Sequence, residues 1–321
     1  MSGLWKTLRV AAKKNEADDI VSFELVDPAG EPLPRFTAGA HIDVEIAPGL
    51  VRQYSLCNDP HERHRYLIGV LREPASRGGS ATLVDTVAPG ALVRTGEPRN
   101  HFALEPLATR VVPMAGGIGI TPILCMAEHL ATTSTPFELH YCTRSRARAA
   151  FCDRISGSIF SKRTCFYFDD APGSMPLDLS KTLTQPGPED HLYVCGPNGF
   201  IEAVLGGALR AGWRPEQLHK EFFTPTTDSR CADDAFEVEI ASTGARFTVP
   251  PNRSVLDVLL ANRIEIPMSC EQGVCGTCVT GVLNGVPDHR DVFMTDEEHA
   301  RNDQFTPCCS RAKSDLLVLD L

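Results

Sequence analysis

Four cysteines toward the carboxyl end of the chain could hold a metal cluster. Cys270, Cys275 and Cys278 follow a C-x4-C-x2-C spacing, and Cys308 comes after a long interval. This is the ligand spacing of a plant-type [2Fe–2S] cluster, in which two irons share four thiolates. The sequence therefore predicts that these four sulfurs converge on one small volume.

Two glycines inside this loop favour the iron–sulfur interpretation over its rivals. Gly273 and Gly276 suit a backbone that folds closely around inorganic sulfide with its N–H groups turned inward. A structural zinc site would prefer two C-x2-C pairs, and only one is present. A disulfide framework is not expected in a large chain without an export signal. Zinc stays as the alternative occupant.

The first hundred residues contain two candidate phosphate-binding and ring-binding segments. Residues 52–56 read Arg-Gln-Tyr-Ser-Leu on an expected strand, where alternation places Arg52 and Tyr54 on one face, with Ser55 opposite or at the strand end. A ring, a guanidinium and a hydroxyl could hold a flavin and its phosphate. Glycines before a helix could approach a phosphate too; here these residues are Arg77, Gly78, Gly79 and Ser80. Taken alone, each segment is more typical of an ordinary strand or helix cap than of a binding site.

Residues 110–226 alternate expected strands with expected helices, as a nucleotide-binding α/β domain does. The strand at 110–114 runs into a glycine loop and then a helix, an arrangement that can cradle a pyrophosphate. Thr121 is predicted as the helix N-cap and Pro122 as its first residue. The candidate binding residues of this loop are Gly116, Gly117, Gly119 and Thr121. The loop lacks the G-x-G-x-x-G form, so a structural turn remains open.

Two further loops should lie at the same edge of that sheet. Expected strands at 137–142 and 191–194 end in loops at 143–146 and 195–198, and a helix over 198–211 should close at Gly212. Ligands bind outside the carboxyl ends of parallel strands. Candidate contacts are Arg144, Cys195, Gly196 and Pro197. For Arg144 the alternatives are the adenosine moiety of a nucleotide and plain solvent.

Three structural patterns follow one another along the chain. Short strands are expected at 7–14, 20–27, 41–47, 51–56, 65–72 and 91–95, with a helix at 80–87, which predicts an antiparallel barrel. After the α/β part, a hairpin over 236–249, a helix from Ser254 and strands at 279–283 and 316–319 predict a sheet gripping one helix. We expect a multi-domain chain with boundaries at 1–105, 106–226, 227–234 (linker) and 235–321.

Charge and hydropathy limit which kinds of partner and which cellular location the protein can have. The 321 residues carry a net charge of −10, which argues against nucleic acid. Without a long apolar run or a secretory segment, we expect no membrane span and a reducing, cytoplasmic location for the twelve cysteines. Residues 233–321 hold 15 acidic and 7 basic residues, a net of −8, which suggests either a docking face or simple solubility. The histidines show no metal-ligand spacing.

Taken together, these motifs resemble the phthalate dioxygenase reductase family over nearly the whole chain. The resemblance rests on residues 52–58, 77–80, 116–122, 195–197 and 270–321. It implies an antiparallel flavin barrel, a parallel-sheet nicotinamide domain and a C-terminal β-grasp ferredoxin domain. Among family members, the chain is most similar to reductase components of aromatic-acid demethylases and dioxygenases.

The resemblance also implies cofactors and their contacts. FMN would lie against Arg52, Tyr54 and Ser55, with Val70 and Leu71 lining it through their backbone and residues 77–80 around its phosphate. NADH would lie across residues 116–121 and 195–197, with Cys195 near the nicotinamide. Cys195 and Ser55 are the expected catalytic residues. The family often has an aromatic residue where this chain has Lys220, so Phe222 or Phe223 could cover the flavin instead.

An electron path follows from what each cofactor carries. Nicotinamide gives two electrons as a hydride, an iron–sulfur cluster accepts one, and a flavin does both, so the flavin must lie between them. We expect transfer from NADH to FMN, to the [2Fe–2S] cluster and to an external oxygenase, a Rieske-type terminal component. Alternatives are a cytochrome P450 acceptor, or an electron-carrier or redox-sensing module without NADH turnover. The preference for NADH over NADPH is not encoded in any of these motifs.

Overall fold

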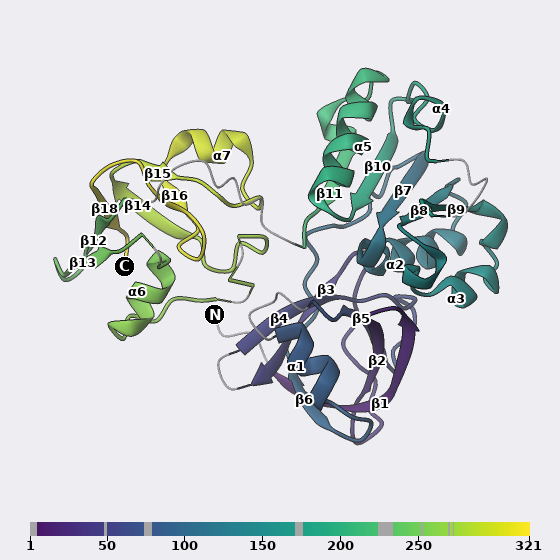
Figure 1. The fold of residues 1–321 in the computed structure, drawn as a ribbon, viewed down its shortest axis with the longest axis horizontal. Coiled ribbons are helices and arrows are strands. Elements are labelled where there is room, and N and C mark those ends of the chain that lie inside the picture. The colour runs from purple at the N-terminus through teal and green to yellow at the C-terminus, as the bar shows by residue number, and fades with distance from the viewer. Residues whose placement is uncertain are drawn as a thin grey trace. The chain divides into compact units, whose positions relative to one another are not determined.

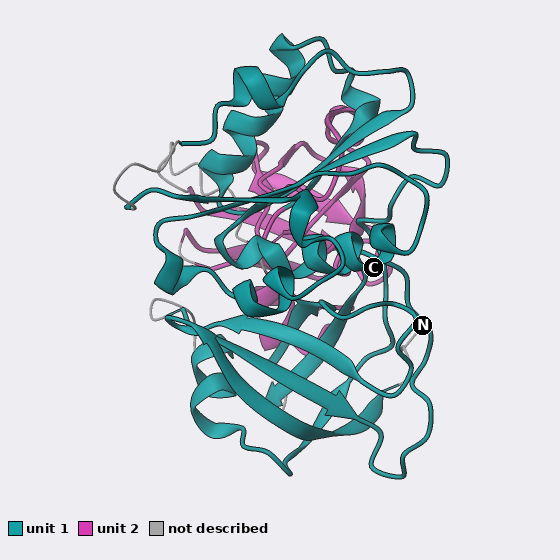
Figure 2. Cartoon of the chain, turned by 90° about the vertical axis from the view of Figure 1, so that its right-hand side faces the viewer, with its two compact units in different colours: residues 1–221 teal, residues 222–321 magenta. Residues whose placement is uncertain are grey.

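The computed structural model describes residues 5–47, 50–73, 79–170, 176–223, 234–251, 253–268, 270–271 and 273–321 (Figure 1). By internal contacts the chain divides into two compact units, residues 1–221 and 222–321 (Figure 2). The first unit contains two separate sheets, and most of the expected linker at 227–234 lies outside the described residues. Within the described part, every helix is too short or too polar to cross a membrane.

The first sheet is a six-stranded antiparallel barrel in the order β4-β3-β6-β1-β2-β5. A bridge between Leu56 and Ile68 links the two ends of this order. All six predicted strands and the predicted helix are confirmed. Their bounds are β1 Lys6–Ala17, β2 Ile20–Val26, β3 His41–Ala47, β4 Leu50–Ser55, β5 Tyr66–Leu71, α1 Gly79–Thr86 and β6 Leu92–Thr95.

The second sheet is fully parallel, in the order β11-β10-β7-β8-β9. Its strands are β7 Arg110–Gly116, β8 Leu139–Thr143, β9 Thr164–Phe168, β10 Asp190–Cys195 and β11 Leu218–Glu221. The α-helices are α2 Ile120–Ala131, α3 Cys152–Ser156, α4 Leu179–Thr182 and α5 Asn198–Arg210, and short 3-10 turns occupy 117–119, 146–148, 161–163 and 215–217.

The parallel sheet differs from the prediction at its two edges. The central strands β7, β8 and β10 were expected, whereas β9 and β11 were not. The residues of β9 are all half-buried, and β11 has no fully buried residue. Strand β11, Leu-His-Lys-Glu, lacks the continuous apolar run of a buried parallel strand, as an edge strand can. Strand β9, Thr-Cys-Phe-Tyr-Phe, does carry an aromatic strand pattern that the prediction overlooked.

The second unit holds a five-stranded sheet, β13-β12-β18-β14-β16, and a small pair, β15-β17. Helix α6 begins with the predicted capping box: Ser254 Oγ accepts from Asp257 N–H, and the Asp257 carboxylate accepts from Ser254 N–H. Apolar residues of α6 pack against the sheet in one core. The bounds are β12 Phe236–Ile240, β13 Arg246–Val249, α6 Val255–Ala261, β14 Thr280–Asn284, β15 Pro287–Asp288, α7 Asp296–Arg301, β16 Gln304–Phe305, β17 Arg311–Ala312 and β18 Leu316–Leu319.

Candidate functional site: a flavin–nucleotide junction and a four-cysteine loop

Strand β4 brings the first two candidate segments together. A Cβ built on Gly79, the first residue of α1, would lie 3.0 Å from the Cγ and Nε atoms of Arg52. The absence of a side chain at Gly79 is therefore what lets the guanidinium rest beside the start of the helix. Ser80 follows, and its hydroxyl accepts from Glu73 N–H at 3.2 Å. A phosphate placed here would meet a guanidinium, a hydroxyl and helix N–H groups.

The ring-binding part of the same strand has an unsatisfied polar atom. Tyr54 Oη is buried and finds no hydrogen-bond partner among the described residues. Burial also raises the pKa of the Tyr54 hydroxyl, so it stays protonated and able to donate. A buried donor without a partner costs free energy, which a bound polar group would recover. The side chains of β4 thus fit a flavin, and Val70 on β5 is fully buried while Leu71 is half-buried.

The two glycine-containing loops of the parallel sheet pack directly on one another. A Cβ on Gly119 would collide with the carbonyl group of Cys195, and one on Gly196 would lie 2.9 Å from Gly116 Cα. A Cβ on Gly116 would come within 2.8 Å of the Phe200 ring. Glycine is thus required here for close approach of two backbones. Gly117, by contrast, has φ +54 and open space around its missing side chain, as a backbone that receives a phosphate would.

The helix after this loop begins earlier than predicted. Its N-cap is Gly119, which offers no side-chain cap, so the prediction of Thr121 as N-cap and Pro122 as first helical residue is wrong. A 3-10 turn at 117–119 leads straight into α2 and takes the place of a cap. Thr121 Oγ1 instead donates to Ile118 O at 3.1 Å. Its methyl group lies against Gly69 of β5, which joins the loop to the flavin barrel.

Three polar side chains meet where the barrel touches the parallel sheet. Cys195 ends β10, fully buried, opposite Glu221 at the end of β11. Ser55 Oγ, from the barrel, donates to Glu221 Oε2 at 3.4 Å. Burial raises the pKa of Glu221 to about 8, and burial together with the Glu221 charge raises that of the Cys195 thiol. Cys195 is therefore a protonated thiol at neutral pH and packs as an apolar group rather than a nucleophile.

Glu221 is a functional candidate that the sequence reasoning missed. The segment around it was examined only for an aromatic residue. The available signal was an acidic residue directly before Phe222 and Phe223, in a segment with no predicted strand. That signal needs the pairing of β10 with β11, which the sequence did not predict.

The four predicted cluster cysteines converge in the second unit. Cys270, Cys275, Cys278 and Cys308 are each at most 8% exposed. The Cys308 thiol interacts with the thiols of Cys270 and Cys278, and Cys275 interacts with Cys270. Thr277 N–H also points to Cys275 Sγ at 3.5 Å, as expected for a thiolate held by backbone donors. Four buried sulfurs with an inward N–H fit an iron–sulfur cluster.

Backbone conformation in this loop explains its two glycines. Gly273 has φ +72 and Gly276 has φ +66, in the left-handed region that side chains disfavour. A Cβ on Gly273 would also collide with Cys309 Sγ, and one on Gly276 would overlap the Phe293 ring. Both positions therefore need glycine for two independent reasons.

Comparison with known proteins agrees with this geometry. Residues 238–313 match the model of the 2Fe-2S iron-sulfur cluster binding domain. The chain is 54% identical to vanillate O-demethylase oxidoreductase of Pseudomonas putida, over 97% of this chain and 98% of that protein. A phthalate dioxygenase reductase structure, described as modular for electron transfer from pyridine nucleotides to [2Fe-2S], covers 99% of this chain and 98% of its own at TM-score 0.80 and 38% identity.

The chain belongs to the phthalate dioxygenase reductase family. It is also similar to an intact type IV self-sufficient cytochrome P450 monooxygenase, at TM-score 0.82 and 38% identity, covering 99% of this chain and 41% of that one. The family is one of oxidoreductases, and the predicted resemblance, fold class and iron–sulfur domain are confirmed.

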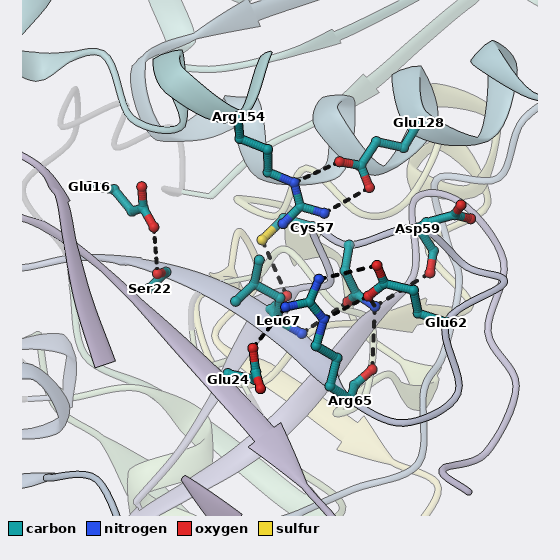
Figure 3. A network of polar contacts seen from close by, with 11 residues as sticks. Glu16, Ser22, Glu24, Cys57, Asp59, Glu62, Arg65, Leu67, Glu128 and Arg154 are labelled. Carbon is teal, nitrogen blue, oxygen red and sulfur yellow. Dashed lines mark hydrogen bonds and ion pairs between the residues drawn. The ribbon is translucent and has the colours of Figure 1, made fainter. Parts of the chain in front are cut away.

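The first unit also holds two groups of half-buried polar contacts, one within the nucleotide domain and one within the barrel (Figure 3). Arg154 on α3 donates to both carboxylate oxygens of Glu128 on α2, at 2.7 and 2.9 Å. Figure 3 shows this pair beside Cys57, whose thiol donates to Leu67 O at 3.2 Å. Cys57 lies two residues after Ser55, and α2 begins at the pyrophosphate loop. These bonds lie within one domain or the other, and Arg154 acts on Cys57 and Arg65 of the barrel through its charge.

The second group stiffens the barrel segment after β4. Arg65 donates to Glu62 at 2.7 and 3.1 Å and to Glu24 of β2 at 2.8 Å. Asn58 is fully buried; its side-chain oxygen accepts from Leu67 N–H at 2.9 Å. These bonds hold the backbone of residues 57–67 in one conformation. The contacts of Arg65 are in the lower half of Figure 3.

The remaining predicted contacts stay predictions. Arg144 follows β8 and is exposed, at the carboxyl edge of the sheet where the predicted loops meet. Phe223 is half-buried in the second unit. Arg77 and Gly78 lie outside the described residues.

Proposed function

We propose that this chain is the reductase component of an aromatic O-demethylase system, with vanillate as the substrate of its partner. It would pass electrons from NADH through FMN and a [2Fe–2S] cluster to a terminal oxygenase. The observation that carries the proposal is the junction of Ser55, Glu221 and Cys195, which joins a flavin barrel to a nucleotide loop in a chain that also holds four convergent cysteines. The identity of 54% to a vanillate O-demethylase oxidoreductase supports the choice of system.

The proposed chemistry divides between the cofactors and the protein. A nicotinamide supplies a hydride, and a flavin converts this pair of electrons into single electrons for an iron–sulfur cluster. The protein binds and orients. Arg52 and Ser80 hold the flavin phosphate, Tyr54 Oη donates to a polar atom of the flavin, and residues 116–121 receive the pyrophosphate of NADH. Because the phosphate contacts gather at one site beside α1, we assign FMN to the barrel.

Glu221 and Ser55 would decide how much charge lies beside the flavin. With a pKa of about 8, Glu221 is neutral at pH 7 and places no negative charge where electrons arrive. The Ser55 hydroxyl bonds to it from the barrel side at 3.4 Å. Fully buried, Cys195 adds bulk without charge and closes the nicotinamide side of the junction to water.

We further propose a Rieske-type partner that meets the acidic second unit. A net charge of −8 over residues 233–321 would attract a basic patch and speed encounter. Raising the ionic strength should then slow electron transfer to the oxygenase. A cytochrome P450 is the second candidate acceptor, favoured by the similarity to a self-sufficient P450 monooxygenase. We place the protein in the cytoplasm, where a reducing environment keeps cluster thiolates available.

The test uses purified holoprotein under anaerobic conditions. The released flavin should be FMN, and titration with NADH should bleach the flavin and cluster absorbance rapidly. The reduced protein should then reduce a vanillate-demethylating Rieske oxygenase faster than a P450. If NADH leaves the protein oxidised, the reductase proposal fails, and a carrier without turnover replaces it.

A further inference from the structure

One face of strands β8 and β9 gathers three different metal-binding side chains. His140 of β8 pairs in register with Cys165 of β9, so the two side chains share one face of the sheet. Glu138 lies two residues before His140, and Cys165 Sγ donates to its carboxylate at 3.1 Å. The three potential ligand atoms lie within 4.8 Å of one another. We propose that Glu138, His140 and Cys165 form a binding site for one zinc ion.

The donor set selects the class of cation. A thiolate, an imidazole and a carboxylate together suit zinc, whereas magnesium and calcium take oxygen ligands only. Zinc–ligand bonds of about 2.0–2.3 Å place tetrahedral ligand atoms roughly 3.5 Å apart, which is compatible with three ligand atoms that lie within 4.8 Å of one another. The exposed Glu138 side chain can rotate to adjust its position. Three protein ligands leave a fourth position for water.

A neighbouring hydroxyl orients the histidine. His140 is 4% exposed, and its Nδ1 atom lies 3.0 Å from Tyr167 Oη. The same hydroxyl also interacts with Cys165, and a partner of this kind fixes the orientation of a ligating imidazole. Cys165 is half-buried and Glu138 is exposed, so an ion has a route from solvent. The site thus combines a buried, oriented ligand with an open entrance.

A second trio, in the other unit, fits a metal less well. His289, Asp291 and His299 also lie within 4.8 Å of one another. However, the two imidazole rings stack at 4.4 Å with an angle of 23°, so their lone pairs run side by side and do not converge. The Asp291 carboxylate already accepts from Met294 N–H at 2.8 Å and contacts His299 at 3.2 Å. The proposal therefore concerns the β8–β9 face alone.

Zinc binding to the holoprotein tests the proposal without an activity readout. Protein with its full iron content is mixed with zinc chloride and a competing chromophoric chelator, desalted, and analysed for zinc and iron. X-ray absorption at the zinc edge then identifies the ligands. Glu138→Gln and Cys165→Ser are the test variants. Glu189→Gln at an exposed position and Cys152→Ser at a half-buried one are the matched controls.

We expect one zinc per wild-type chain, bound by one sulfur and lighter atoms, with the iron content unchanged. Both test variants should lose about 100-fold or more in zinc affinity, and Tyr167→Phe about tenfold, since removing a partner of a ligating histidine costs 10–100-fold. The two controls should bind as the wild type does. Absence of zinc from the wild type, equal retention by both test variants, or uptake only at the expense of iron would overturn the proposal.

Discussion

Replacing Glu221 with Gln should change how the stability of the first unit depends on pH. The folded protein holds the Glu221 proton up to a pKa of about 8, whereas an unfolded glutamate releases it near its ordinary pKa of 4.5. Between these values the unfolded state binds fewer protons, so wild-type stability falls as pH rises. Glutamine has the same shape and no proton to release, so the variant should lack this fall.

The size of the effect follows from the pKa difference. A difference of about 3.5 units at 1.36 kcal/mol per unit sets an upper limit of about 5 kcal/mol. Because Glu221 keeps some exposed surface, we expect about half of this, roughly 2–3 kcal/mol. For a unit of this size, that corresponds to a rise in melting temperature of about 4–12 °C.

The assay follows thermal release of the flavin by its fluorescence at pH 5, 7 and 9. Wild type and Glu221→Gln should melt close together at pH 5, and the variant should melt higher at pH 9. Ser55→Ala is an informative control because the Ser55 hydroxyl lowers the pKa of Glu221. In this variant the fall in melting temperature should continue to a higher pH than in the wild type. Glu216→Gln, at an exposed position, controls for glutamine itself. A difference between wild type and Glu221→Gln that stays constant from pH 5 to 9 would refute a buried, proton-holding Glu221.

Three further changes test other parts of the structure. Cys275→Ser should abolish cytochrome c reduction through the cluster while ferricyanide reduction at the flavin persists; loss of both activities would mean misfolding and contradict the assignment. Gly119→Ala should raise the KM for NADH at least about tenfold, because the new Cβ collides with the Cys195 carbonyl, and an unchanged KM would show that the two loops need not touch. Arg154→Met leaves Glu128 buried without its partner and should cost about 2–3 kcal/mol, lowering the melting temperature by several degrees. Replacing Glu128 and Arg154 together should recover most of that loss, and a double variant no more stable than Arg154→Met would argue against the pairing.

Local patterns were enough to predict most elements. Each of these elements is indicated by a pattern within about ten residues. The barrel strands show alternation, the central parallel strands show an apolar run, and the helix from Ser254 shows a cap. The edge strand β11 was missed because its polar sequence shows no such run, whereas the aromatic run of β9 was overlooked. The cap at Thr121 was wrong because a 3-10 turn, which leaves no sequence mark of its own, starts the helix at Ile120.

The sequence by itself predicted the cluster ligands, since the spacing of Cys270, Cys275 and Cys278 is a short-range property of the chain and points to Cys308 as the fourth. Only the tertiary structure decided that Ser55 meets Glu221, a contact between residues 166 positions apart. The same holds for Cys165 beside His140, which depends on the pairing of one strand with another. The spacing of cysteines along one loop can therefore indicate which group that loop binds. Contacts between distant segments, and the pKa shifts that burial brings to them, exist only once the strands have found their partners.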